Sequence, residues 1–417
     1  MVKIIKDYIP IFICIFLGFT QLKVLVPFVN SLVVMIVGLG ISFLFYKMFY
    51  RQVYLIWMIT YFLVLLLNNF IGDFYFSLIS NVIEEICVLL FPAAFSYYVI
   101  TQNKISLGKA LVCSFYVLII YSSITTFIVD MLFPNAVRSS VALLNRGEVE
   151  VLNLYYGLGM VTYKFTHALP VIIPALIFAV LKSKAKGLFR LMALLTLVAA
   201  LLTIYISNAT TALLLAILAL ASSLLISENS NETTFIRLAL LIFIVMPLLI
   251  NSNLLEDMLN TVSSLNGSET NDYVSRLEDL REMSDTGEAA GDLESRMDKY
   301  SISLSILKGD IFLGSDLPTG EHSAILDRLA CLGLIGWVPY IIYIINIIIS
   351  NKKYLLSNKV VPYYLIGVVT AILMLSTKNM SGWDMWFMFF CLLPVSLWFY
   401  SQDFYEVNEL TNVDEIQ

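Results

Sequence analysis

The sequence predicts an all-α fold, namely a polytopic integral membrane protein with about 12 transmembrane helices and one large extracytoplasmic loop. Three observations predict this class. Apolar residues make up 59% of the 417 residues and charged residues only 13%, and the mean hydropathy is +0.85. A water-soluble domain of this size needs a larger polar exterior. Apolar stretches of about 20 residues, the length that crosses ~30 Å of hydrocarbon, recur along the chain.

We expect two membrane blocks separated by a polar loop. Residues 1–252 hold about nine spans, residues 253–322 form the large extracytoplasmic loop with short helices, and residues 323–417 hold about three spans and a cytoplasmic tail. The first span continues into others, so it is expected to be a retained anchor. Because only Lys23 separates the first two spans, a hairpin or tilted pair is an alternative there. The expected spans are 8–22, 24–46, 53–71, 77–100, 109–132, 160–181, 188–207, 210–227, 235–252, 323–349, 360–377 and 383–401.

The distribution of Lys and Arg predicts the orientation. With the N-terminus inside, thirteen basic residues fall in short inner loops, whereas the short outer loops hold only Lys23 and Lys378. We therefore expect a multi-pass protein of the cell (inner, cytoplasmic) membrane with both termini cytoplasmic. The thirteen inner residues are Lys3, Lys6, Lys47, Arg51, Lys104, Lys109, Lys182, Lys184, Lys186, Arg190, Lys352, Lys353 and Lys359.

The large outer loop is acidic but carries arginines. Residues 253–321 contain fifteen acidic and five basic residues, a local net charge of −10. Within the loop, 273–283 is predicted to be a short helix, and 293–307 shows an amphipathic pattern that favours a helix lying along the membrane surface. A smaller outer segment, 133–159, also contains arginines.

His322, one of only two histidines, lies where the acidic loop re-enters the membrane. An imidazole has an ordinary pKa near 6.5, so at this boundary it can exchange protons with water and still reach a lipid-borne substrate. Asp327 and Arg328 follow further along the span, and Arg328 should face a polar cleft or pair with a carboxylate. Gly333 and Gly336 permit close helix approach. The alternative is that these polar residues only mark the start of a helix.

The outer arginines are candidates for binding phosphate groups. A guanidinium offers forked donors that match phosphate oxygens and stays charged at any relevant pH. In so acidic a loop, the same residues could instead be solvated partners of nearby Asp and Glu. Arg296 is the favoured candidate. The outer arginines are Arg138, Arg146, Arg276, Arg281 and Arg296.

Ionisable residues also interrupt two predicted spans. Glu84 and Glu85 lie in the fourth span, and Lys164 and His167 lie in the sixth at helical i, i+3 spacing. Such groups usually face a cavity or one another. An ion pair that joins two helices and a role in a polar cleft are both open interpretations.

Several familiar chemistries have no motif here. The chain has no Gly-rich phosphate loop and no metal-binding His or Cys pattern, and its five cysteines all fall in apolar runs. The inner loops are too short to form the soluble domain that a nucleotide-sugar glycosyltransferase requires. Any chemistry is therefore expected on the outer face, without nucleotide energy, a cofactor or a required metal, and no nucleic-acid partner is expected.

The candidate residues around His322 lie at defined intervals along the sequence. His322-Ser323 is followed by nine residues, then by Gly333 and Gly336, and it is preceded by an Arg-to-Gly approach. This pattern resembles the superfamily of Wzy-type polysaccharide polymerases and O-antigen ligases. That family commonly has a Pro and paired glycines before the His, whereas residues 309–316 lack them. The other matching residues are Ser295-Arg296, Tyr300, Phe312-Leu313-Gly314, Gly320, Arg138, Asn145-Arg146-Gly147 and Tyr156-Gly157-Leu158-Gly159.

The resemblance implies a membrane glycosyltransferase that polymerises polyprenyl-diphosphate-linked oligosaccharide repeat units into a surface polysaccharide, with inversion at the anomeric carbon. It implies a lipid-linked donor and acceptor in the bilayer as partners, together with a chain-length regulator and a flippase of the same pathway. Two alternatives stay open: a ligase that moves a finished glycan to a terminal acceptor, and a precursor transporter or flippase. In the enzyme, His322 and Arg296 are expected to be catalytic, and the expected substrate-binding residues are Arg276, Arg281, Arg138, Arg146 and Arg328.

Overall fold

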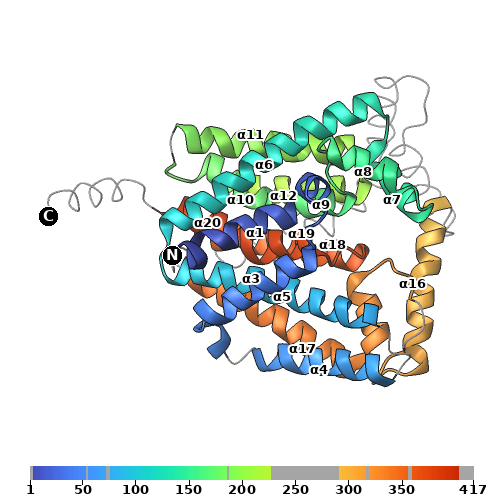
Figure 1. The fold of residues 1–417 in the computed structure, drawn as a ribbon. Coiled ribbons are helices and arrows are strands. Elements are labelled where there is room, and N and C mark those ends of the chain that lie inside the picture. The colour runs from blue at the N-terminus through green and yellow to red at the C-terminus, as the bar shows by residue number, and fades with distance from the viewer. Residues whose placement is uncertain are drawn as a thin grey trace. The chain divides into compact units, whose positions relative to one another are not determined.

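The computed structural model describes the chain except for residues 1–2, 53–54, 72–75, 186, 227–290, 316–318, 356–358 and 403–417. All regular elements of the described residues are helices (Figure 1). The chain divides into two compact units. Unit 1 comprises Met1–Leu225, Val338–Met374 and Met380–Gln417, and unit 2 comprises Ile226–Trp337 and Leu375–Asn379.

Six helical segments of the described residues are long and apolar enough to cross a membrane, and four shorter apolar helices accompany them. All ten coincide with predicted spans, so the expectation of a helical membrane protein is confirmed. The number twelve stays a prediction, and the expected span 235–252 lies outside the described residues. The six are Ser80–Thr101 in α5 (Phe76–Thr101), α6 (Ile105–Leu132), Tyr163–Leu181, α11 (Leu188–Ile206), α17 (Ala324–Tyr354) and Trp383–Ser401; the four are α3 (Ser31–Phe45), Leu55–Leu67 in α4 (Leu55–Ile71), α12 (Thr210–Leu224) and α18 (Val361–Thr377).

The first two predicted spans differ from the structure. The chain forms a π-helical turn η1 (Ile4–Tyr8), α1 (Ile9–Gly18), a break at Phe19 and the short α2 (Thr20–Leu25). A turn then precedes α3, whose N-cap Asn30 accepts a hydrogen bond from the Leu32 N–H at 2.8 Å. Asn is favoured at this position because its side chain satisfies a backbone donor of the first turn. The helix of the predicted span 24–46 therefore begins at Ser31, after this turn.

Helices α6 and α11 show how unit 1 packs and where it would meet lipid. Small residues of α11, including Ala193 and Ala200, are fully buried, and the hydroxyl of Ser123 on α6 donates to the Ala199 carbonyl at 3.0 Å. Small residues and such hydrogen bonds are typical of helix contacts in membranes. Apolar side chains at Leu191, Leu194, Leu195, Val198 and Leu202 are exposed. This stripe at helical spacing is the surface that acyl chains would cover.

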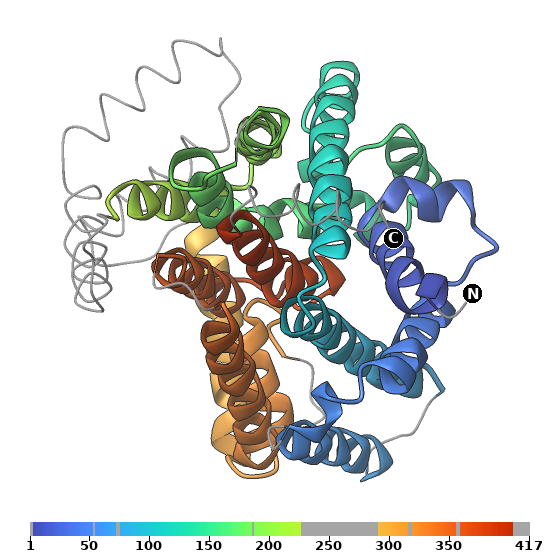
Figure 2. The same cartoon turned by 90° about the vertical axis from the view of Figure 1, so that its left-hand side faces the viewer.

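The centre of unit 1 is formed by the segment α19 (Trp383–Phe387), η4 (Met388–Leu392) and α20 (Leu393–Ser401). Nearly all of its side chains are buried. It contacts α5, α6, α9 (Tyr163–Ala168) and α10 (Ile173–Leu181). Figure 2 shows this segment in red, running between the cyan helices and the green ones.

Unit 2 contains α16 (Gly291–Gly309) and the first part of α17. Helix α16 confirms the predicted helix over 293–307, although its buried side chains include Ser303 and Ile306 whereas Met297 and Leu304 are exposed. Helix α17 is broken at Gly333, where φ is 58° and ψ is −170°. The predicted span 323–349 is therefore present, with a break at Gly333. The predicted helix 273–283 lies outside the described residues.

Candidate active site at the start of α17

The residue after His322 is the N-cap of α17. The Ser323 side-chain oxygen accepts a hydrogen bond from the Leu326 N–H at 3.2 Å. In return, the Asp327 carboxylate accepts the Ser323 N–H at 3.2 Å. This reciprocal arrangement resembles a capping box, in which two backbone donors of a helix start are satisfied at once. Ser323 and Asp327 therefore fix the backbone that carries His322.

A buried hydrogen-bond network ties this helix start to α16. The hydroxyl of Ser303 donates to Asp327 Oδ1 at 2.7 Å and accepts the Gly320 N–H at 3.0 Å. Ser303 and Asp327 are 1% and 7% exposed, so each would destabilise the fold without a partner. A Cβ on Gly320 would lie 2.0 Å from the Lys299 carbonyl oxygen. Only glycine permits this close approach of the two backbones.

The His322 ring is held against Tyr300. The two rings meet edge to face, with centroids 5.4 Å apart and an interplanar angle of 68°. The Tyr300 hydroxyl donates to the Thr377 carbonyl at 3.1 Å, which anchors the phenol. The residue as a whole is partly exposed, while the Nε2 atom of its ring is buried. The ring is therefore oriented by its neighbours.

The residue before His322 adopts an unusual backbone conformation. Glu321 has φ +53°, in the left-handed region. A non-glycine residue there costs about 1–2 kcal/mol and persists only where the surrounding structure determines it. Here the Gly320 and Ser323 backbone bonds on both sides of the turn determine it. Backbone conformations of this kind cluster at functional sites.

The break at Gly333 is paired with a loop. The Leu334 and Ile335 N–H groups donate to the carbonyls of Ile311 and Phe312 at 2.9 and 3.1 Å. A Cβ on Gly333 would lie 2.2 Å from the Phe312 carbonyl oxygen. Gly333 therefore permits a close backbone approach, but within unit 2 its partner is the loop 310–315 and not the helix that was expected. This loop leads toward His322 and is held in place by backbone bonds.

Of the predicted arginines that lie in unit 2, Arg328 is the one whose side chain the structure describes. Arg328, half-buried, donates from Nη1 to the Ala324 carbonyl at 3.4 Å. Arg296 lies in α16, four residues before Tyr300, and its side chain is outside the described residues. Arg276 and Arg281 lie outside them as well.

Two further predicted arginines belong to unit 1. Arg138, in α7 (Ala136–Asn145), donates from Nη1 to the Tyr163 hydroxyl at 3.3 Å. Arg146 is exposed in the turn before α8 (Val149–Gly157). Convergence of the arginines on His322 stays a prediction.

Of the four ionisable residues that interrupt the fourth and sixth predicted spans, His167 and Glu85 form hydrogen bonds, and Glu84 and Lys164 belong to a cluster of charged side chains. His167 is buried and its Nδ1 lies 2.9 Å from the Tyr163 carbonyl oxygen, whereas Glu85 accepts a hydrogen bond from the Tyr61 hydroxyl at 3.2 Å. Both contacts are typical of structural side chains inside a helix bundle.

A mixed-charge cluster in unit 1 includes one residue that the sequence analysis did not select. Asp384 accepts a hydrogen bond from the Thr162 hydroxyl at 3.3 Å, and Lys23 and Lys164 both act on it electrostatically. Glu84 acts on Lys23. The predicted Lys164 therefore interacts with a carboxylate, but this carboxylate belongs to the last span.

Three site residues escaped the sequence analysis. Ser303 gave no signal beyond a polar residue in an amphipathic helix, and the carbonyls of Thr377 and Lys378 become site groups only in the fold. The Lys378 carbonyl accepts the Ala324 N–H at 3.2 Å, so segment 375–379 supports the start of α17 from a distant part of the chain.

Comparison of the chain with protein-family models, curated proteins and solved structures finds no match. The described residues themselves define the class of the protein. It is a helical membrane protein in which His322 is held at the start of α17, a helix long enough to cross a membrane.

Proposed function

We propose that the protein is a membrane glycosyltransferase that polymerises polyprenyl-diphosphate-linked oligosaccharide repeat units into a surface polysaccharide on the outer membrane face. The observation that carries the proposal is the way His322 is held. Its backbone lies between the Gly320 and Ser323 hydrogen bonds, and its ring lies against Tyr300. A general base needs such a fixed position because proton transfer requires hydrogen-bond reach to the reacting hydroxyl.

The proposed reaction is a direct displacement. A hydroxyl oxygen of the acceptor repeat unit attacks the anomeric carbon of the lipid-linked donor chain, and His322 accepts the hydroxyl proton. The bond between the anomeric carbon and the diphosphate oxygen breaks, and the diphosphate leaves with the electron pair. One attack of this kind inverts the anomeric configuration.

The leaving diphosphate gains negative charge as this bond breaks, so cationic groups near it lower the barrier. Arg296, in the helix that also carries Tyr300, is assigned to this charge. The other outer arginines, Arg276, Arg281, Arg138 and Arg146, are assigned to substrate binding. Arg328 is a weaker candidate because its Nη1 bonds within its own helix. No step in this scheme requires a metal ion.

Two other functions make different predictions. A ligase would use the same base and the same donor but a terminal acceptor. A transporter or flippase gains from the cluster of Lys23, Glu84, Lys164 and Asp384 in unit 1, since mixed charges inside membrane bundles often mark a transport path. A transporter has no need of a histidine held in this way.

The deciding assay uses purified full-length protein in lipid nanodiscs with lipid-linked repeat units extracted from a deletion strain. A ladder of lengthening products, formed also in the presence of a chelator, supports the polymerase. Strict dependence on a second acceptor supports the ligase, and absence of any new glycosidic bond favours transport.

Variants test the roles of the residues. His322→Ala should lower the rate by about 10²- to 10⁴-fold, the usual contribution of a general base, and Arg296→Ala should also reduce it strongly. Arg190→Ala is the matched control, because Arg190 is exposed and predicted to face the cytoplasm. If His322→Ala and Arg296→Ala both insert normally and still make long polymer, the enzymatic assignment is wrong.

A further inference from the structure

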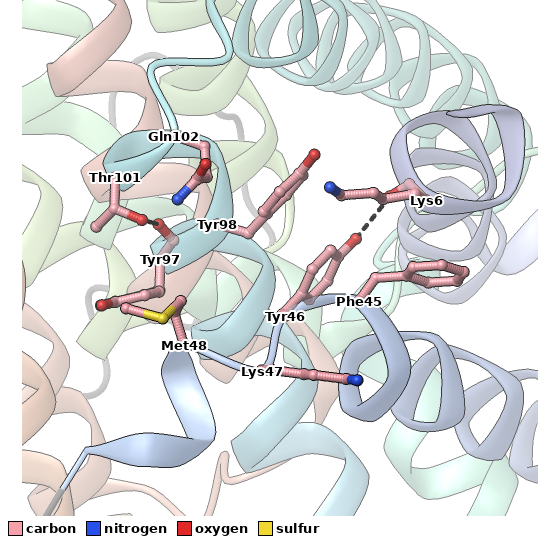
Figure 3. A pocket seen from close by; sticks show the side chains of 9 residues that line it. All are labelled: Lys6, Phe45, Tyr46, Lys47, Met48, Tyr97, Tyr98, Thr101 and Gln102. Carbon is pink, nitrogen blue, oxygen red and sulfur yellow. Dashed lines mark hydrogen bonds between the residues drawn. The ribbon is translucent and has the colours of Figure 1, made fainter. Parts of the chain in front are cut away.

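A pocket of about 190 Å³ lies in unit 1, far along the sequence from His322 (Figure 3). Three segments line it: the π-helical turn η1, the turn that follows α3, and the C-terminal end of α5. Two of its lining residues carry charge, and both are lysines, Lys6 and Lys47. All three segments fall on the face that the distribution of basic residues predicts to be cytoplasmic.

The pocket walls are fixed by internal bonds. The Tyr46 hydroxyl donates to the Lys6 carbonyl at 2.9 Å, and the Tyr98 hydroxyl donates to Asp7 Oδ1 at 2.8 Å. The Tyr46 and Tyr98 rings stack with centroids 4.5 Å apart. η1 is thereby joined to α3 and α5. A site whose walls are already ordered loses little entropy when a ligand binds.

The pocket has an excess of positive charge. Lys6 Nζ lies 4.9 Å from the centroid of the Tyr98 ring, and Lys104 Nζ lies 6.0 Å from it. Lys47 is exposed at the rim. Asp7 is buried beneath these lysines, where the Tyr98 hydroxyl bonds to it. Of these charged residues, Lys6 and Lys47 line the pocket and the carboxylate does not, so the charge of the lining suits an anion.

The volume limits the size of that anion. Sites for drug-sized molecules are usually about 300–1,000 Å³. At about 190 Å³ the pocket is smaller than such sites, and it suits a phosphate group with a few attached atoms.

The surface beside the pocket indicates where the rest of the ligand lies. Large apolar side chains of the same segments are exposed there, namely Ile4 at 59%, Phe43 at 49%, Leu44 at 65% and Met48 at 52%. Such a surface next to a cationic pocket suits a molecule with a charged head and apolar chains. The cytoplasmic leaflet also carries the negative surface potential of anionic lipids.

We propose that this pocket binds the phosphate of an anionic phospholipid, with the acyl chains against the neighbouring apolar surface, and that the lipid fastens η1 to α3 and α5. The proposal is independent of the glycosyl-transfer reaction.

The test uses the full-length protein, purified in a neutral detergent and studied by native mass spectrometry and thermal unfolding. Three probes are compared: phosphatidylglycerol, phosphatidylcholine and inorganic phosphate. Phosphatidylglycerol should bind and raise the unfolding temperature, whereas phosphatidylcholine, whose headgroup is neutral overall, should bind weakly. The double variant Lys6→Gln with Lys47→Gln should weaken phosphatidylglycerol binding about 25-fold, from about fivefold for each lysine near an anionic headgroup.

Lys109→Gln is the matched control. Lys109 also lies over an aromatic ring, with Nζ 4.9 Å from the Phe189 centroid, and it is on the same predicted face but outside the pocket. The Lys109→Gln variant should therefore bind phosphatidylglycerol like the wild type. Equal binding of the two lipids, or unchanged phosphatidylglycerol binding in the Lys6/Lys47 double variant, overturns the proposal. Displacement of phosphatidylglycerol by inorganic phosphate, at phosphate concentrations that leave the wild type and Lys109→Gln stable, also overturns the proposal. The site would then bind a soluble phosphate instead of a lipid headgroup.

Discussion

Replacing Gly333 with alanine should detach the loop 310–315 from the break in α17. Two effects add at this position. First, φ 58° with ψ −170° belongs to a backbone region that is essentially restricted to glycine, where another residue costs about 1–3 kcal/mol. Second, the new Cβ would lie 2.2 Å from the Phe312 carbonyl oxygen, so the loop must move.

Moving the loop breaks the bonds from the Leu334 and Ile335 N–H groups to the loop carbonyls. Each backbone bond contributes about 1 kcal/mol net. Together with the backbone term, the local destabilisation is roughly 3–5 kcal/mol. Hydrogen–deuterium exchange of these amides should therefore become about 10²- to 10⁴-fold faster, since every 1.4 kcal/mol is a factor of ten. Polymer formation should fall in parallel.

Gly187→Ala is the control for this experiment. Gly187 has the same φ of 58°, but the space around its Cβ position is open. It therefore carries the conformational penalty of a positive φ without the collision. If Gly333→Ala exchanges and functions like Gly187→Ala, the loop is not held by the break in α17 and the reasoning fails.

Three further predictions concern the same site and its orientation. Ser303→Ala leaves the buried Asp327 carboxylate short of one donor and should destabilise unit 2 by about 1–3 kcal/mol in thermal unfolding. Ser305→Ala, on the exposed side of the same helix, should have little effect. Equal loss of stability in both variants would contradict the hydrogen-bond network. Tyr300→Phe keeps the ring beside the imidazole but removes the hydroxyl bond. It should therefore retain more activity than Tyr300→Leu. The reverse order of activities would show that the ring contact is unimportant. A membrane-impermeant maleimide should label a cysteine placed at Ser301 in intact cells, but one placed at Gln102 only after permeabilisation; the opposite pattern would invert the topology and remove the outer-face chemistry.

The fold class was accessible from the sequence because burial in lipid imposes a simple pattern. A helix that crosses ~30 Å of hydrocarbon must be apolar over about 20 residues, and this pattern located α5, α6 and α11 within a few residues. The errors have local causes. The N-cap at Asn30 and the break at Gly333 interrupt apolar stretches that hydropathy treats as continuous. Both depend on single residues, which an average over a window does not register.

The site was only partly accessible. The polar-to-apolar boundary and the glycine spacing pointed to His322 and Gly333, whereas Gly320 was singled out only by the family resemblance. The partners Ser303 and Thr377 were not singled out, because they come from α16 and from the C-terminal end of α18. Serine is common on helix surfaces, and a backbone carbonyl has no sequence signature. Contacts of this kind become visible only when the fold places them together.

The interval between His322 and Gly333 has a geometric interpretation. The nine residues between Ser323 and Gly333 form one short helical segment of about 13 Å, at 1.5 Å per residue. One end is set by the Ser323 cap and its bond to Asp327, and the other by the break that the loop 310–315 occupies. One residue more or fewer would rotate the two ends by about 100° relative to each other, so cap and loop could not both keep their partners. The interval therefore sets the position of the histidine relative to the loop.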